Sequence, residues 1–280
     1  MKKILITGAN SYIGTSFEKY MQQWPDRYLV DTVDMIGGSW REKDFSGYDA
    51  VFHVAGIAHQ KETKENAHLY DAVNRDLVIE TARKAKKDGV AQFIFLSSMS
   101  VYGLDRGIIT PDTVPAPNSN YGRSKLEAEQ GLQALAAEGF RVTILRPPMV
   151  YGKNCRGNFQ LMRKLVQKSP VFPAVSNRRS LISIRNLCAF VRLVADREEA
   201  GVFCPQNREY VNTTHMAKLI ARETGRTVWF SRLAGIGVRC LVPVVGAARK
   251  AFSTLIYQDW EKHAFCYNEE SFEDSIRGSV

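Results

Sequence analysis

The 280-residue sequence has few of the features that mark metal-binding, secreted or membrane-spanning proteins. Its five histidines form no cluster with carboxylates or thiols at ligand spacing, so we expect no metal. The first apolar run stops after three residues at Thr7-Gly8, too soon for a secretory signal. No Cys-x-x-Cys pair occurs among the five scattered cysteines, which favours reduced thiols and a cytoplasmic location. These cysteines are at 155, 188, 204, 240 and 266.

Acidic residues are also scarce relative to basic ones, and the formal charge is +9. Such an excess suits a nucleic acid, an anionic membrane surface or a phosphate-bearing substrate. No zinc-finger, RNA-recognition or helix-turn-helix signature accompanies it, so we expect no nucleic-acid partner.

Strand-like and helix-like segments alternate regularly over the first half of the chain. Strands are predicted at 3–6, 28–34, 50–55, 91–98 and 141–146, and helices at 12–24, 67–87 and 124–139. This alternation predicts an α/β fold with a Rossmann-type doubly wound parallel sheet. Beyond residue 150 the pattern is less regular, with helices at 156–168 and 214–223. We therefore predict a dinucleotide-binding domain over 1–150 and a smaller α/β substrate-binding lobe over 151–280, interleaved with it.

The first predicted strand leads into TGANSYIG, residues 7–14. Gly8 permits a tight turn, Gly14 lets the helix approach the sheet, and Ser11 is a small residue where a third glycine is typical. A loop of this kind at a helix N-terminus binds a pyrophosphate through free N–H groups. Asp34 follows at the end of the second strand, where its carboxylate would bind the adenosine ribose and repel the 2′-phosphate of NADP. The sequence therefore favours NAD, although Asp34 also suits a simple turn before Gly37-Gly38.

A second pattern is more specific. In SNYGRSKLEAE, Tyr121 and Lys125 lie one helical turn apart. A tyrosine with an ordinary pKa near 10 needs a nearby positive charge to act as a base at neutral pH. We therefore expect Lys125, together with the positive nicotinamide ring of a bound cofactor, to lower the pKa of Tyr121 toward neutrality.

Several motifs occur together in a fixed order: TGANSYIG, Asp44-Phe45, HVAG at 53–56, Asn74, SSMSVYG, YGRSK and LRPPMVYG. Over residues 1 to about 190 the chain resembles the extended short-chain dehydrogenase/reductases, in particular the nucleotide-sugar epimerases and reductases related to UDP-glucose 4-epimerase.

The resemblance implies roles for individual residues. Tyr121 is the general base, Lys125 holds the nicotinamide ribose, and Ser98 bonds the sugar oxygen. The resemblance also implies which residues contact the cofactor. They lie in the glycine loop and at the start of the first helix, beside the adenine, in the segment after the third strand, and near residue 148. These residues are Gly8, Ser11, Tyr12, Ile13, Gly14, Asp34, Asp44, Phe45, Ala55, Gly56, Asn74, Tyr121, Lys125 and Pro148.

Departures from the family narrow the reaction. Dehydratases carry an Asp-Glu pair after the catalytic Ser or Thr, where this chain has Met99 and Ser100, so elimination of water is not expected. Ser98, Ser100, Asn158 and Arg179 are the candidate substrate contacts, with Arg179 suited to a diphosphate. Met149 replaces an asparagine that relatives place beside the diphosphate, which leaves the sugar carrier open.

We expect an NAD-dependent 4-epimerase of a UDP-hexose or UDP-N-acetylhexosamine that serves surface polysaccharide biosynthesis. The alternatives are an NAD(P)H-dependent reductase of a nucleotide-linked 4-keto sugar and an epimerase of a polyprenyl-diphosphate-linked sugar. A non-catalytic dinucleotide sensor is the alternative from another class. The resemblance further implies a homodimer formed through 67–87 and the helix that carries Tyr121.

One later segment fits none of these roles. Residues 226–250 carry five basic and no acidic residues, interleaved with apolar runs too short to span a bilayer. We favour a core-packing or oligomer-contact helix pair, and the alternative is a surface element that rests on an anionic membrane.

Overall fold

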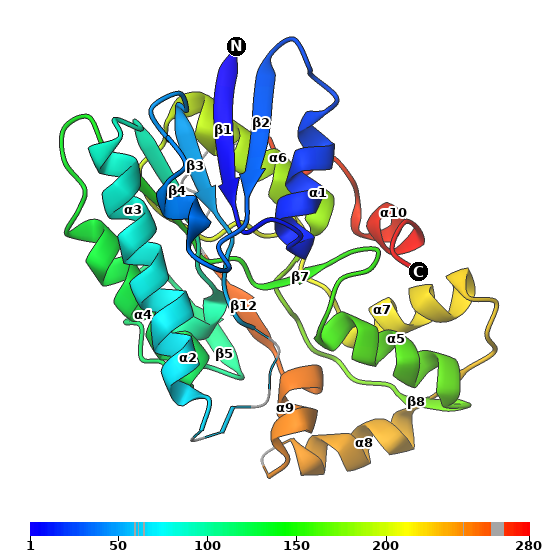
Figure 1. The fold of residues 1–280 in the computed structure, drawn as a ribbon. Coiled ribbons are helices and arrows are strands. Elements are labelled where there is room, and N and C mark those ends of the chain that lie inside the picture. The colour runs from blue at the N-terminus through cyan, green and yellow to red at the C-terminus, as the bar shows by residue number, and fades with distance from the viewer. Residues whose placement is uncertain (59, 61, 64, 243, 259–265) are drawn as a thin grey trace. The chain divides into compact units, whose positions relative to one another are not determined.

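The computed structural model describes the chain except for residues 59, 61, 64, 243 and 259–265 (Figure 1). The chain forms two compact units. Unit 1 comprises Met1–Gly103, Val114–Pro147 and Cys188–Pro205, and unit 2 comprises Leu104–Thr113, Pro148–Leu187 and Gln206–Val280.

Unit 1 is built around a six-stranded parallel sheet with strand order β10-β6-β4-β3-β1-β2. The chain moves outward from β1 to β2, then returns to the other side of β1 for β3, so the direction of winding reverses between β1 and β3. This reversal, at the carboxyl ends of the strands, is where doubly wound folds bind ligands. The elements are β1 (Lys2–Thr7), α1 (Tyr12–Met21), β2 (Tyr28–Val33), η1 (Ser39–Arg41), β3 (Ala50–His53), α2 (Ala67–Asp71), η2 (Ala72–Asp76), α3 (Leu77–Lys87), β4 (Gln92–Leu96), η3 (Met99–Tyr102), α4 (Asn120–Gln133), β6 (Arg141–Leu145) and β10 (Gly201–Phe203).

Helices cover both faces of this sheet, with α3 and α4 on one face and α1 and α6 (Ile184–Arg197) on the other (Figure 1). Alternate residues of β1 point to opposite faces, so that Leu5 joins the core under α3 and α4 whereas Ile6 approaches α1. The inner strands β1, β3, β4 and β6 are mostly buried on both faces, which explains why their sequences are largely apolar runs. The predicted fold class, a Rossmann-type doubly wound parallel sheet, is confirmed.

Unit 2 contains three two-stranded parallel sheets, β8 with β11, β5 with β12, and β7 with β9. Its buried aromatic residues include Tyr151, whose hydroxyl bonds Ser275 and Asn207. The elements are β5 (Gly107–Ile109), β7 (Met149–Tyr151), α5 (Asn158–Lys168), β8 (Val171–Pro173), β9 (Leu181–Ser183), α7 (Thr213–Glu223), β11 (Trp229–Ser231), α8 (Arg232–Leu241), α9 (Gly246–Phe252), β12 (Leu255–Tyr257) and α10 (Phe272–Arg277).

Several predicted helices differ from the structure, and the one predicted over 12–24 already ends at Met21. The segment 67–87 is divided by a π-helical turn, η2, into α2 and α3. Helix α4 begins at Asn120, because Ser119 caps it, and ends at Gln133 rather than at 139, since Ala137 and Phe140 pair across a turn. The segment 226–250 forms a helix pair as predicted, but α8 does not pack into the core, because Gly235 is the one buried residue of that helix.

Candidate active site

The loop after β1 and the segment after β3 meet at the point where the winding of the sheet reverses. The N–H groups of Val54 and Ala55 both donate to the carbonyl of Thr7, at 3.0 Å. Gly8 lies against Ala55 so closely that a Cβ at position 8 would come within 2.7 Å of the Ala55 nitrogen. Gly8 also has a backbone φ of +116°, which residues with a side chain rarely adopt. Glycine is therefore required at position 8 by both conformation and space.

Helix α1 starts directly after this loop. The Ser11 hydroxyl caps it by accepting the Gly14 N–H at 3.1 Å. A Cβ on Gly14 would lie 2.6 Å from the Ser11 oxygen and 3.2 Å from a methyl of Ile6, so Gly14 also needs to be small. Tyr12 and Ile13 form the first turn of α1, where backbone N–H groups have no partner within the helix. The cramped glycines and this helix start fit the pyrophosphate of a dinucleotide.

Asp34 lies at the same edge of the sheet. It follows Val33, whose carbonyl accepts the Gly8 N–H at 3.0 Å, and its own carboxylate accepts the Ile36 N–H at 3.0 Å. The side chain is exposed. Asp34 thus shapes the turn before Gly37 and remains next to the glycine loop, where a ribose would lie.

The adenine-side residues are used within the protein. The Asp44 carboxylate accepts the backbone N–H and the hydroxyl of Ser46, and these bonds lower the pKa of the Asp44 carboxyl group. The Phe45 side chain is fully buried in the core under the Lys84 ammonium. The Phe45 N–H donates to Asp88, and its carbonyl accepts the Tyr48 N–H, both at 3.1 Å. A cofactor contact from this pair therefore stays a prediction.

Asn74 lies in the π-helical turn η2 and is fully buried. Its side-chain oxygen accepts the Ile57 N–H at 2.9 Å, and its amide donates to the Ile57 carbonyl at 3.0 Å. Gly56 lies between this amide and Lys125, because a Cβ at position 56 would come within 2.9 Å of the Asn74 oxygen and 3.4 Å of the Lys125 nitrogen. Asn74 therefore fixes the loop after β3, and Gly56 allows Lys125 to approach it.

Ser98, Tyr121 and Lys125 come together at the carboxyl end of β4. Ser98 caps the short helix η3, and its hydroxyl is bonded both to Ser100 and to the Tyr121 phenol. Lys125 is 5% exposed, and at 2.9 Å it donates to the carbonyl of Leu96, the last residue of β4. The structure therefore assembles the predicted trio from β4 and α4.

Burial dominates the electrostatics of this trio. It raises the pKa of the Tyr121 phenol, and the hydrogen bond from Ser98 offsets only part of that increase. Burial also lowers the pKa of Lys125 to about 7, with Glu129 acting in the opposite direction. In the protein alone burial therefore dominates the pKa of Tyr121, and its lowering by Lys125 together with the nicotinamide ring of a bound cofactor stays a prediction.

Two buried groups near Lys125, His53 and Glu129, were not predicted as functional from the sequence. His53 bonds Thr7 through Nδ1 at 2.8 Å, and burial together with the Lys125 charge lowers its pKa to about 3, so it stays neutral. Glu129 lies one helical turn after Lys125 and is bonded by Arg146 at 3.0 Å; both are at most 8% exposed. The signal for Glu129 was present, because residues 121, 125 and 129 share one face of α4.

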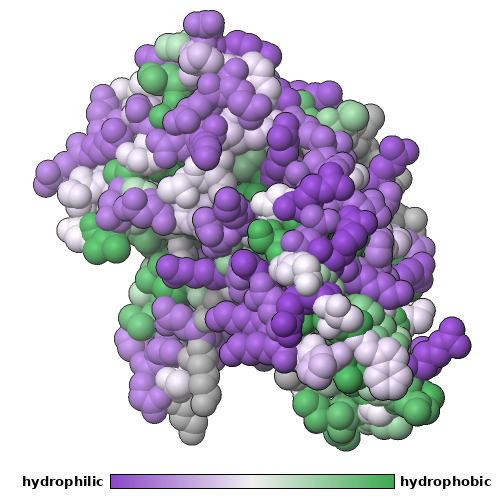
Figure 2. Space-filling model, turned by 90° about the vertical axis from the view of Figure 1, so that its right-hand side faces the viewer, coloured by the Kyte–Doolittle hydropathy of each residue, from purple (hydrophilic) through white to green (hydrophobic). Residues whose placement is uncertain are grey.

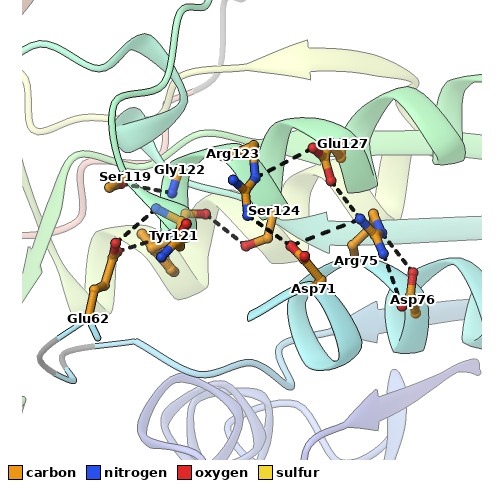
Figure 3. A network of polar contacts seen from close by, with 11 residues as sticks. Glu62, Asp71, Arg75, Asp76, Ser119, Tyr121, Gly122, Arg123, Ser124 and Glu127 are labelled. Carbon is orange, nitrogen blue, oxygen red and sulfur yellow. Dashed lines mark hydrogen bonds and ion pairs between the residues drawn. The ribbon is translucent and has the colours of Figure 1, made fainter. Parts of the chain in front are cut away.

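A loop carboxylate also caps the helix that carries Tyr121 (Figure 3). Glu62 accepts the N–H groups of Asn120 and Tyr121 at 2.9 and 3.1 Å. A carboxylate at a helix N-terminus is favourable, because it satisfies free N–H groups and meets the positive end of the helix dipole. No local sequence signal links Glu62 to a helix that begins almost sixty residues later.

Ion pairs then join α4 to the helical segment that contains Asn74 (Figure 3). Arg75 bonds Glu127 at 2.9 Å, and Arg123 lies 3.4 Å from Asp71. These partly exposed pairs hold η2 and α2 against the helix of Tyr121.

The remaining candidate residues belong to unit 2, apart from Ser100, which lies next to Ser98. Arg179 is largely buried and donates to the Ser253 carbonyl at 3.0 Å, and burial lowers the pKa of its guanidinium group. Asn158 is exposed at the start of α5, and Pro148 directly precedes β7. Their roles toward substrate and cofactor stay predictions.

A doubly wound parallel sheet with a cramped glycine loop at its switch point and a Ser-Tyr-Lys trio at the carboxyl end of β4 defines an extended short-chain dehydrogenase/reductase. More narrowly, the chain belongs to the NAD dependent epimerase/dehydratase family, whose model matches residues 4–203. The glycine loop, the start of α1 and Asp34 are the residues that would hold the NAD of this family.

The chain is similar to characterised members of the family. It is 32% identical over 254 residues to a UDP-glucose 4-epimerase of Vibrio cholerae, covering 81% of this chain and 77% of that protein. It is 28% identical over 215 residues to an N-acetyl-α-D-glucosaminyl-diphospho-ditrans,octacis-undecaprenol 4-epimerase of Escherichia coli O157:H7, covering 71% and 64%. The fold matches UDP-glucuronic acid 4-epimerase from Bacillus cereus, solved with NAD, with a TM-score of 0.75, 19% identity and 99% and 97% coverage.

Proposed function

We propose that the protein is an NAD-dependent sugar 4-epimerase that acts on a UDP-hexose or UDP-N-acetylhexosamine through a transient 4-keto sugar. The observation that carries the proposal is the trio at the end of β4, in which the Tyr121 phenol is bonded to Ser98 and the Lys125 ammonium lies one helical turn away. A sugar hydroxyl between Ser98 and Tyr121 would have both a proton acceptor and an orienting hydroxyl within reach.

In this reaction the Tyr121 phenolate accepts the proton of the sugar 4-hydroxyl, and Ser98 donates a hydrogen bond to the oxygen that becomes the 4-keto group. The glycine loop and the start of α1 would hold NAD, which when bound would supply a reversible hydride acceptor for C4 of the sugar and a positive charge that favours the Tyr121 phenolate. Tyr121 then gives its proton back to the 4-oxygen of the epimer.

Lys125 has a second task, which is to bind and orient. Its ammonium already uses the Leu96 carbonyl, and it faces Gly56, so two further N–H donors are available for ribose hydroxyls. Binding of hydroxyl oxygens would favour the charged ammonium, and the charged ammonium in turn favours the Tyr121 phenolate.

Epimerisation is favoured over dehydration by the residues that follow Ser98. Met99 is buried and has no group that can exchange a proton, and the Ser100 hydroxyl is bonded to Ser98. Neither residue can replace the carboxyl pair that eliminates water.

Support for the substrate carrier comes from unit 2 and from the relatives. Arg179 presents a buried guanidinium group that suits a diphosphate, and Asn158 lies at the exposed start of α5. UDP-glucose is the substrate named for the Vibrio cholerae relative, and an undecaprenyl-diphosphate sugar for the Escherichia coli relative. A polyprenyl-diphosphate-linked sugar is therefore the second carrier that we propose to test.

We further propose that the enzyme acts in the cytoplasm, in surface polysaccharide biosynthesis. It would form a homodimer through α4 and the segment 67–87, which comprises α2, η2 and α3, and it would contact the membrane through 226–250. Within the described part of the chain, none of the helices is both long and apolar enough to cross a bilayer. Light scattering coupled to size exclusion would measure the oligomeric state.

The test of the reaction is incubation of the purified protein with UDP-glucose and with UDP-N-acetylglucosamine, without a reductant, followed by separation of the sugars. Appearance of the C4 epimer without net NADH formation supports the epimerase. Use of one NAD(P)H per 4-keto sugar consumed, with no epimer formed, would assign the reductase instead.

The Tyr121→Phe variant separates catalysis from binding. It keeps the ring but removes the proton acceptor, so turnover should fall by about 10²–10⁴-fold while NAD affinity changes little. A cellular function that survives this substitution unchanged would point to a dinucleotide sensor.

A further inference from the structure

The excess positive charge of the chain is confined to unit 2. Unit 1 contains 19 Lys and Arg residues and 19 Asp and Glu residues, whereas unit 2 contains 19 and 10, which accounts for the whole formal charge of +9. Between Thr224 and Gln258 the sequence contains no acidic residue at all. The dinucleotide site lies in unit 1 and does not account for this charge. The uneven distribution therefore indicates that unit 2 has an anionic partner of its own.

Helix α8 presents large apolar side chains to solvent in this same stretch. Leu233 is 80% and Ile236 58% exposed, while Trp229, in the strand just before the helix, is 69% exposed. Gly235 faces the opposite way, toward the Ala174 carbonyl, and a Cβ at position 235 would collide with that oxygen. The helix is therefore held against β8 by its glycine side, and its apolar side is left uncovered by the described residues.

Arginines flank this apolar side. Leu233, Ile236 and Cys240 follow at helical spacing on the outer side of α8, and Arg232 and Arg239, seven residues apart, lie along one edge of it. Arg226 precedes Trp229, and Lys250 follows in α9. Among the described residues, no carboxylate lies within ion-pairing distance of Arg226, Arg232, Arg239 or Lys250, although Arg249 lies 3.9 Å from Asp105.

Figure 2 shows apolar residues gathered with hydrophilic ones beside them at the lower end of the molecule, the height at which Figure 1 places α8 and α9. Val244, between the two helices, is 75% exposed. We call the surface formed by Trp229, Leu233, Ile236 and Val244, with the three arginines and one lysine named above (226, 232, 239 and 250), the basic apolar face.

We infer that the basic apolar face rests on the anionic surface of a lipid bilayer. Protruding apolar side chains that include a tryptophan lie among basic residues for which the described part of the chain supplies no counter-ion. This combination matches the interfacial zone of a membrane, where apolar groups enter the acyl boundary and cations meet lipid headgroups. A second copy of the same face is a poor partner, because it would bring like charges together. A nucleic acid would attract the basic residues but would leave Leu233 and Val244 without an apolar environment.

This inference deepens the proposed function by specifying its membrane contact, and it is tested without substrate, so that lipid binding and catalysis can fail separately. The full-length protein is floated with vesicles of phosphatidylcholine and with vesicles in which about one third of the lipid is phosphatidylglycerol. Binding is expected to the anionic vesicles alone. It should weaken strongly in high salt, because the screening length falls from about 10 Å to about 3 Å between 0.1 and 1 M.

Two sets of variants locate the contact. Arg232→Gln and Arg239→Gln should each weaken partitioning roughly fivefold, and Leu233→Ser roughly tenfold. Controls of matched exposure lie in unit 1: Val114→Ser, where the native side chain is 78% exposed, and the Lys19→Gln change on α1. Both controls should float like the native protein. All variants should keep the native unfolding temperature, because each altered side chain is at the surface.

Trp229 provides a direct reading of the bound state. Its fluorescence should shift to shorter wavelength when anionic vesicles are added, and Trp229→Phe should remove that shift while leaving flotation nearly intact. The inference is overturned if the protein fails to float with anionic vesicles at low salt, or if the Leu233 and arginine variants bind as well as the controls. Binding to duplex DNA that is weakened by the arginine changes but not by Leu233→Ser, with no vesicle binding, would assign the face to nucleic acid.

Discussion

Replacing Lys125 by methionine should make the protein more stable while it removes activity. Lys125 is 5% exposed, lies 4.6 Å from the centre of the Phe95 ring, and makes one protein hydrogen bond, to the Leu96 carbonyl. The nearby carboxylate of Glu129 is already paired with Arg146. The Lys125 ammonium therefore lies in largely apolar surroundings, and a methionine side chain would fill the same space without a charge.

The size of the effect follows from the pKa of Lys125, which burial lowers from 10.5 to about 7. One pKa unit is worth about 1.36 kcal/mol, so the charged state costs the folded protein on the order of 3–5 kcal/mol at neutral pH. The Leu96 carbonyl loses its partner in the variant, which costs about 1–3 kcal/mol. The net expectation is a gain in unfolding free energy on the order of 2 kcal/mol.

The dependence on pH tests the reasoning more sharply than the gain itself. Between pH 7 and pH 10 the unfolded chain holds the Lys125 proton and the folded chain does not, so the stability of the native protein rises with pH relative to the variant. The advantage of Lys125→Met should therefore be largest below pH 7 and should shrink toward pH 10. Urea unfolding at several pH values measures it, with the exposed Lys87→Met as control. A variant that is less stable than the native protein at neutral pH, or an advantage that does not change with pH, would refute the argument.

Three further predictions concern groups around this site. Ser11→Gly should leave NAD affinity nearly unchanged, since glycine is an N-cap only a few tenths of a kcal/mol poorer, whereas Ser11→Leu should abolish binding measured by calorimetry. Glu129→Gln should lower the unfolding free energy by about 3 kcal/mol, because it leaves the Arg146 charge buried without its counter-ion, and Glu127→Gln on the same helix should cost less than about 1 kcal/mol. An equal loss in both would contradict this. Glu62→Gln should lower the unfolding temperature slightly, by the equivalent of about 0.3–1 kcal/mol, because the variant loses the negative charge that meets the positive end of the α4 dipole. Salt screens this interaction, so an unchanged melting curve at low ionic strength would speak against that cap.

The dinucleotide-binding half of the fold could be predicted from sequence because its signals are local. Three signals follow one another along the chain: the apolar run after Met1, the turn at Gly8 and the helix start at Ser11. The structure shows why they occur, because the run forms a buried strand, Gly8 has no room for a side chain, and the Ser11 hydroxyl caps α1. Tyr121 and Lys125 could be paired because a helix brings residues four apart together.

The parts that could not be predicted depend on contacts between distant segments. Glu62 reaches Asn120 from a loop, and the π-helical turn at Asn74 inserts one residue that a helical periodicity does not reveal. Helix α6 was missed although Ser183 bonds the Asn186 N–H as a helix start does, because the strand β9 runs directly into it without a loop. The effect of burial on the pKa values of Tyr121 and Lys125 could not be predicted either, since the extent of burial is a property of the packed sheet and helix.

The strand order of the sheet has a consequence for how the chain folds as it is synthesised. Strand β10, which pairs with β6, is made by Gly201–Phe203, more than fifty residues after β6 leaves the ribosome. Until then β6 has an unpaired edge, and parallel pairing across so long a connection forms slowly. A nascent chain that ends near residue 150 would therefore expose the unpaired edge of β6, and such an edge favours aggregation until Gly201–Phe203 has been made and has paired with it.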